Sequence, residues 1–131
     1  MPINSRAKGA RFERLLASKF REQGYDAKRT AQYCGKTGQA ADVDGLPGIH
    51  VEAKAQERMQ LYDWMAQAKR DAAGTGNRPA VFHKKNNADI LVTMRMDDWF
   101  ELYREWEAGN ALRGIKEENN GMDQHSGQMA R

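Results

Sequence analysis

The sequence predicts an α/β fold in which a mixed central sheet is flanked by helices. In three segments apolar residues recur at every third or fourth position, as in amphipathic helices. Between these segments lie short stretches of alternating or continuous apolar residues, which are typical of strands. The resulting order is helix, three strands, helix, two strands, helix. A meander followed by a helical crossover to further strands is the arrangement of a layered α/β domain.

The first helix is predicted over residues 8–23. Phe12, Leu16 and Phe20 form its apolar stripe, and Ser5 is its expected N-cap. A strand over 25–30 and a loop over 31–39 are expected to follow.

A β-hairpin is predicted next. Gly and Pro residues at 45–48 indicate a turn that joins a short strand over 41–44 to a longer one. The longer strand alternates two kinds of side chain, with Ile49, Val51 and Ala53 on an apolar face and His50, Glu52 and Lys54 on a polar face.

The second helix and the last two strands are predicted over 59–73, 80–83 and 90–94. The strand over 90–94 is apolar on both faces, which favours a central position in the sheet.

The last helix is expected to begin at a cap formed by Asp97 and to end at Gly109. Its aromatic stripe favours core packing, with a dimer surface as the alternative (Trp99, Tyr103 and Trp106). Because the sequence then becomes polar and aperiodic, we expect one domain over 1–109 and a flexible tail over 110–131.

Two carboxylates are predicted to face each other across the hairpin. If the turn is centred near Pro47, residues whose numbers sum to 94 lie opposite one another, which pairs Asp42 with Glu52. Opposed side chains lie about 4.5–5.5 Å apart at Cβ, so two carboxylates there repel each other. A divalent cation between them removes the repulsion, and oxygen ligands of this kind suit Mg²⁺, with Mn²⁺ as a substitute.

Lys54 and Glu13 are the further candidates for this site. Lys54 shares a strand face with Glu52, where it can position an attacking water, stabilise charge on a phosphate or take a proton. Glu13 lies at the border of the apolar stripe of its helix and can reach toward the sheet, or it can pair with a nearby arginine. With a metal, these are the parts needed to hydrolyse a phosphodiester.

The charge distribution suggests a polyanionic partner, although a solvated basic helix face is the simpler alternative. Residues 1–37 contain nine Lys and Arg but three acids, a charge of +6, so the remainder carries −3.

The single cysteine (Cys34), the lack of a signal peptide and the lack of a long apolar run favour a cytoplasmic protein without a membrane span. The scattered histidines (His50, His83 and His125) show no ligand spacing and are interpreted as ordinary solvated side chains.

The order of these residues resembles the PD-(D/E)XK nuclease superfamily, and within it the small Holliday junction resolvases of the archaeal type and their phage relatives. The resemblance spans about residues 5–95. Ala41 stands where the superfamily has a proline, and Asp44 is a competitor for the aspartate role, although its place beside Gly45 is explained by the turn. The segments that carry the resemblance are K8-G9-A10-R11-F12-E13-R14, G24-Y25, Arg29, A41-D42-V43, H50-V51-E52-A53-K54 and Q67-A68.

The resemblance implies a restriction-endonuclease-like αβββαβ core and a metal-dependent DNA endonuclease. Its metal ligands would be Glu13, Asp42, Glu52 and the backbone carbonyl of Ala53, with Lys54 as the catalytic lysine. Residues implied to contact DNA are Arg6, Lys8, Arg11, Arg29 and Gln67.

The resemblance further implies a homodimer that acts on branched DNA in recombination or repair, within a bacterial or phage-infected cell. Two alternatives remain open at the level of sequence. One is a DNA-binding module of the same fold without catalysis. The other is a restriction or repair nuclease that acts on linear or damaged duplex.

Overall fold

The computed structural model describes residues 4–30 and 40–119 and divides the chain into two compact units. The unit Met1–Arg95 contains the sheet with helices α1 (Ser5–Glu22) and α2 (Leu61–Ala72). The unit Met96–Arg131 contains helix α3. None of the helices in the described part of the chain has the length and apolar character needed to span a membrane.

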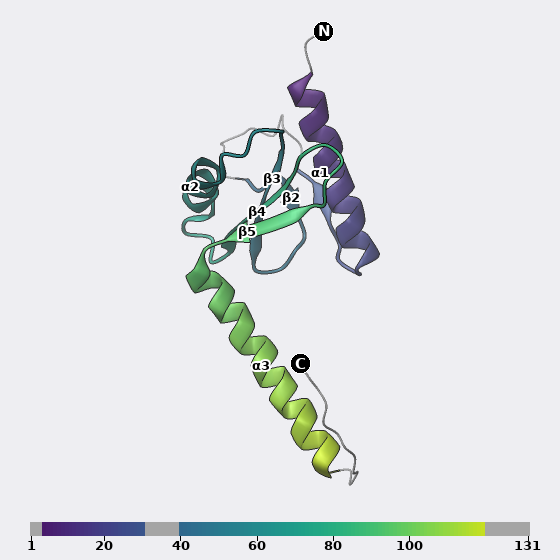
Figure 1. The fold of residues 1–131 in the computed structure, drawn as a ribbon, viewed down its shortest axis with the longest axis vertical. Coiled ribbons are helices and arrows are strands. Elements are labelled where there is room, and N and C mark those ends of the chain that lie inside the picture. Colours follow the sequence, from purple (N-terminus) through teal and green to yellow (C-terminus); the bar gives the residue numbers. More distant parts are fainter. Residues whose placement is uncertain (1–3, 31–39, 120–131) are drawn as a thin grey trace. The chain divides into compact units, whose positions relative to one another are not determined.

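In the described part of the chain, five strands form one mixed sheet in the order β1-β2-β3-β4-β5. Figure 1 labels β2 to β5 of this sheet. The antiparallel meander consists of β1 (Lys28–Arg29), β2 (Val43–Asp44) and β3 (Ile49–Ala55). Helix α2 then leads to β4 (Arg78–Lys84), which runs parallel to β3, and β5 (Leu91–Met94) returns antiparallel to β4. The order of elements and the mixed pairing are those that the sequence predicts.

The two helices of this unit cover opposite faces of the sheet. Phe12 and Leu16 of α1 pack with Val51 in one buried cluster, while Trp64 of α2 packs with Val81 in another. Since side chains alternate along a strand, the residues of β3 on either side of Val51 face α2. Helix α2 therefore covers the polar face of β3.

Helix α1 begins three residues earlier than predicted, and Ser5 is its first residue and not its N-cap. The cap is Asn4, whose side-chain oxygen accepts a hydrogen bond from the Ala7 N–H at 3.0 Å. Asn and Ser both cap helices well, so residue type alone does not decide between these adjacent positions.

The turn of the hairpin agrees with the prediction. The N–H of Ile49 donates to the carbonyl of Leu46 at 3.2 Å, and Gly45 has a φ of 110°. A Cβ at Gly45 would overlap the backbone of Asp26, so glycine is required there for steric reasons as well.

The central position predicted for the last strand is wrong. Strand β5 is an edge strand, and Leu91 and Val92 are 57% and 54% exposed. Short apolar runs do not report how many neighbours a strand has, because an edge strand can carry apolar side chains on both faces.

The predicted end of the last helix is also wrong. Helix α3 spans Met96–Asn119 and passes through Gly109 without a break. The helix therefore extends ten residues into the segment 110–131 that was predicted to be a flexible tail, and residues 120–131 lie outside the described residues. Within this unit, the rings of the aromatic stripe (Trp99, Tyr103 and Trp106) lie against one another along α3. Core packing or a dimer surface for this stripe stays a prediction.

Candidate active site

The hairpin places Asp42 beside Glu52. Val43 faces Val51 across the β2–β3 ladder, a pair whose numbers sum to 94 as the sequence predicts. Next to this pair, the Asp42 N–H donates to the Val51 carbonyl at 2.9 Å. The Asp42 carboxylate accepts a hydrogen bond from the Ala53 N–H, also at 2.9 Å. Asp42 is thus fixed against the segment of β3 that carries Glu52.

The carboxyl of Asp42 is strongly perturbed. The pKa of Asp42 is raised to about 7, chiefly by burial and next by the negative charge of Glu52, with a contribution of the same sign from Glu13. The Ala53 N–H and the positive charge of Lys54 act in the opposite direction. Three carboxylates from α1, from the segment before β2 and from β3 therefore converge on one region. A nearby divalent cation would relieve this repulsion.

Glu52 is buried, with 3% of its surface exposed, and a basic side chain lies beside it. Lys54 Nζ lies 3.9 Å from Glu52 Oε2, an ion pair rather than a hydrogen bond. Both side chains project from the polar face of β3, as predicted from their spacing. Lys54 is held near the carboxylates and remains partly exposed.

Glu13 combines both interpretations that the sequence left open. It is buried at the border of the α1 core, and its Oε1 lies 2.7 Å from Arg29 Nε. Arg29, expected to contact phosphate, is therefore engaged by an acid of the candidate site. The ion pair joins α1 to β1 at the edge of the cluster of three carboxylates.

The other residues expected at DNA are distributed between two helices. Arg6 and Arg11 on α1 are exposed, and Lys8 Nζ lies 3.9 Å from Glu57 Oε2. Gln67 is half-buried on α2. Asp44, the competitor for the aspartate role, is exposed in β2 opposite Lys28.

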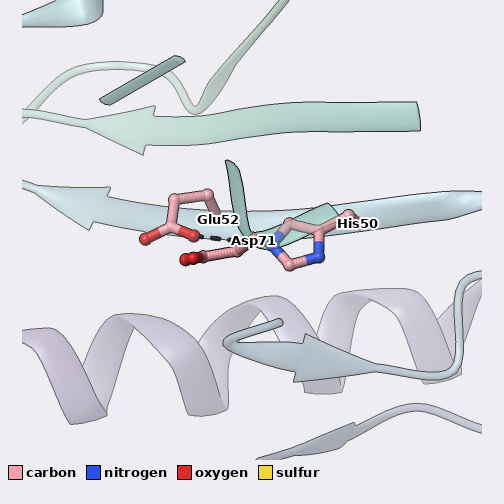
Figure 2. A group of neighbouring side chains, drawn as sticks. All are labelled: His50, Glu52 and Asp71. Atoms are coloured by element: carbon pink, nitrogen blue, oxygen red, sulfur yellow. Dashed lines mark ion pairs between the residues drawn. The ribbon is translucent and has the colours of Figure 1, made fainter. Parts of the chain in front are cut away.

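His50 and Asp71 are neighbours of Glu52 that the sequence analysis did not assign to the site (Figure 2). His50 and His83 are 3% and 4% exposed, so the interpretation of these two as solvated histidines is wrong, while His125 lies outside the described residues. His83 Nε2 forms a hydrogen bond with the Thr93 hydroxyl at 2.9 Å, and burial lowers the pKa of His83. The sequence signal that could have placed His50 in the site was its position on the polar face of β3, beside Glu52. Asp71, on the crossover helix, had no comparable signal in the sequence.

The donor set fits a divalent metal ion. Buried carboxylates supply hard oxygen ligands, and their mutual repulsion favours a cation among them. A helix acid, an aspartate before one strand and a Glu-x-Lys pair on the next form the arrangement of the PD-(D/E)XK class of nucleases, which the sequence resembles.

The comparisons with known proteins agree with this class. The model of a family described as "Phage putative PDDEXK endonuclease" matches residues 4–130, and the chain belongs to this family of endonucleases. Among solved structures, the chain is similar to Hjc of Archaeoglobus fulgidus, a Holliday junction resolvase from an archaeal hyperthermophile. The two are 26% identical with a TM-score of 0.52, over 66% of this chain and 72% of that one. No curated protein sequence matches.

Proposed function

We propose that this protein is a metal-dependent DNA endonuclease that recognises the structure of its substrate, with branched DNA as the leading substrate. The observation that carries the proposal is the convergence of Glu13, Asp42 and Glu52 in a place where burial, together with the charges of the other two acids, raises the pKa of Asp42 to about 7. Groups with such perturbed pKa values concentrate at functional sites. Mg²⁺ is the proposed metal, with Mn²⁺ as a substitute.

Each residue of the site has a distinct proposed part. The carboxylates of Glu13, Asp42 and Glu52 and the carbonyl of Ala53 would hold the metal, which when bound supplies Lewis-acid stabilisation and lowers the pKa of a water. The Ala53 N–H holds the Asp42 carboxylate in place at 2.9 Å. Lys54, anchored by Glu52, would orient the attacking water and stabilise the negative charge that develops on the phosphate.

The basic side chains of α1 are proposed to contact the DNA backbone. Arg6 and Arg11 are exposed, and the first turn of α1 contains no acid. We propose that Lys8 and Arg29, and Gln67 on α2, also contact the DNA. Contacts of this kind position a duplex without reading its sequence.

The preference for branched DNA is supported by the likeness to the archaeal resolvase. A resolvase that makes two symmetric cuts needs two active sites, so we propose a homodimer. Recombination or repair of phage DNA is the corresponding proposed role.

The test is cleavage of end-labelled four-way junction, flap, nicked and linear DNA with Mg²⁺ or with EDTA. We expect cleavage of the junction with Mg²⁺ and none with EDTA. Asp42→Asn is the inactive variant and Asp44→Asn its matched control, because Asp44 is a nearby but exposed acid. Equal cleavage of all four substrates would contradict structure selectivity. Binding without cleavage would indicate a DNA-binding module.

A further inference from the structure

A second group of potential ligands lies next to the proposed catalytic site. His50 and Glu52 of β3 and Asp71 of α2 each offer one ligand atom, and these atoms lie within 4.8 Å of one another (Figure 2). We propose that this group binds a transition-metal ion, with Glu52 as a ligand shared with the catalytic metal. The inference rests on the proposed function only in the second role of Glu52.

The spacing of the group is compatible with one ion. Ligand nitrogen and oxygen atoms lie about 2.1 Å from such ions, so two of them on opposite sides are separated by about 4.2 Å. His50 Nε2 lies 3.7 Å from Glu52 Oε1, within that limit. All of the ligand atoms lie within 4.8 Å of one another, so a closing movement of at most about 0.6 Å by the side chains is sufficient, and one of them, Asp71, is only half-buried.

His50 supplies the observation that points to a ligand. It is 97% buried, and its Nε2 has no hydrogen-bond partner although it points toward Glu52. Buried polar atoms are almost always satisfied, by protein, water or an ion. At 3.7 Å the Glu52 oxygen is too distant for a hydrogen bond but suitably placed to share a cation with the imidazole.

The two oxygens of Glu52 face different partners. Oε1 lies nearest His50 Nε2, and Oε2 lies 3.9 Å from Lys54 Nζ. The Glu52 carboxylate therefore lies at the border between the proposed catalytic site and the group formed with His50 and Asp71. Asp71 adds a second negative charge on the His50 side.

The ligand types select the metal. Mg²⁺ binds oxygen and seldom imidazole, whereas Mn²⁺, Co²⁺ and Zn²⁺ accept imidazole together with carboxylates. Three protein ligands leave positions for water. The alternative is an ion triad in which a protonated His50 neutralises Glu52 and Asp71 without any metal.

The experiment titrates Co²⁺ into the full chain with excess Mg²⁺ present, which occupies the oxygen site. Visible d–d absorption reports the geometry of bound Co²⁺, and calorimetry reports its affinity. We expect one bound Co²⁺ with a spectrum that depends on an imidazole ligand. Asp71→Asn and His50→Gln should each lower the affinity at least about 10-fold, the smallest effect expected for residues at a metal site.

Two control variants and the choice of Asp71 for the test keep the result interpretable. Asp89→Asn removes one exposed acid from a turn and should leave the Co²⁺ affinity unchanged. Asp71 is half-buried on a helix, so Asp71→Asn tests the site even where replacement of buried His50 unfolds the chain. Asp42→Asn should keep the Co²⁺ spectrum while it abolishes cleavage with Mg²⁺. If the parent protein does not cleave DNA but still binds Co²⁺ in a way that depends on Asp71, the result contradicts the proposed function and leaves this site standing. A Co²⁺ spectrum and affinity that are the same in Asp71→Asn as in the parent would overturn the site and favour the ion triad.

Discussion

Arg29 Nε and Glu13 Oε1 lie 2.7 Å apart, which links a residue of the proposed DNA surface to a residue of the proposed metal site. Glu13 is buried, so the loss of its partner leaves a poorly solvated carboxylate without an ion pair. In the metal-free protein we expect Arg29→Ala to lower the free energy of unfolding by about 2 kcal/mol, a value typical of hydrogen bonds to charged groups.

The contribution of this pair is measured by a double-mutant cycle of Arg29→Ala and Glu13→Gln in urea with EDTA. The double variant should be less destabilised than the sum of the two single variants. The control is Arg14→Ala, which replaces an exposed arginine next to Glu13 on α1 and should change the stability little. Additive effects of the two substitutions would show that the pair contributes nothing to stability.

Removal of either central carboxylate should separate DNA binding from cleavage. Asp42→Asn and Glu52→Gln each remove a proposed metal ligand and a negative charge that repels phosphate. We expect no detectable cleavage with Mg²⁺ and equal or tighter binding of junction DNA, measured by a cleavage assay and by fluorescence anisotropy. Cleavage by either variant at the parent rate would remove that residue from the site.

Lys54 should affect the rate and not the assembly of the site. Because we propose that it acts on developing charge, Lys54→Ala should lower the single-turnover rate by about 10²–10³-fold, the range seen for loss of one transition-state donor. The Mg²⁺ concentration at half-maximal rate should change little. Lys85→Ala, an exposed lysine in a turn, is the matched control. An Mg²⁺ requirement that rises in parallel with the loss of rate would indicate a role in metal binding.

The raised pKa of Asp42 predicts how the stability of the metal-free protein depends on pH. The pKa is 3.8 in the ordinary state and about 7 in the fold, so between these values the folded state holds a proton that the unfolded state has lost. The stability due to this group is complete below pH 4 and is lost as the pH rises through 7. Its slope reaches about −1.4 kcal/mol per pH unit.

The measurement compares urea unfolding of the parent and Asp42→Asn with EDTA across pH 4–8. The difference between the two isolates the contribution of Asp42 from those of other titrating groups. Metal binding should show the opposite trend, since the ion displaces the proton and its affinity rises up to about pH 7. Parallel stability curves for the two proteins would contradict the raised pKa.

The basic face of α1 predicts a steep dependence of DNA binding on salt. If Lys8 and Arg11 both contact phosphates, their replacement by Ala should reduce the slope of log K against log salt by about 2. Junction and linear DNA should weaken to a similar extent, because phosphate contacts carry little sequence information. Replacing Lys69 and Arg70, two exposed cations on α2, removes the same charge elsewhere. An equal loss of slope in that control would show a general charge effect.

The sequence by itself determined the order of elements, the mixed sheet and the register that brings Asp42 to Glu52. These features depend on local periodicity and on a short turn, because a hairpin of known centre allows only one pairing of opposed residues. The shared strand face of Glu52 and Lys54 follows from the same alternation. The family assignment then extends these local patterns to the whole domain.

Only the tertiary structure decided which polar residues are buried and which apolar ones are not. His50 is buried because α2 covers the polar face of β3, whereas Leu91 is exposed on β5, the edge strand of the sheet in the described part of the chain. Asp71 reached Glu52 through the packing of a helix on the sheet, a contact over 19 positions that no local pattern encodes. Burial and long-range proximity arise from how elements pack, and a single sequence specifies them only through the complete fold.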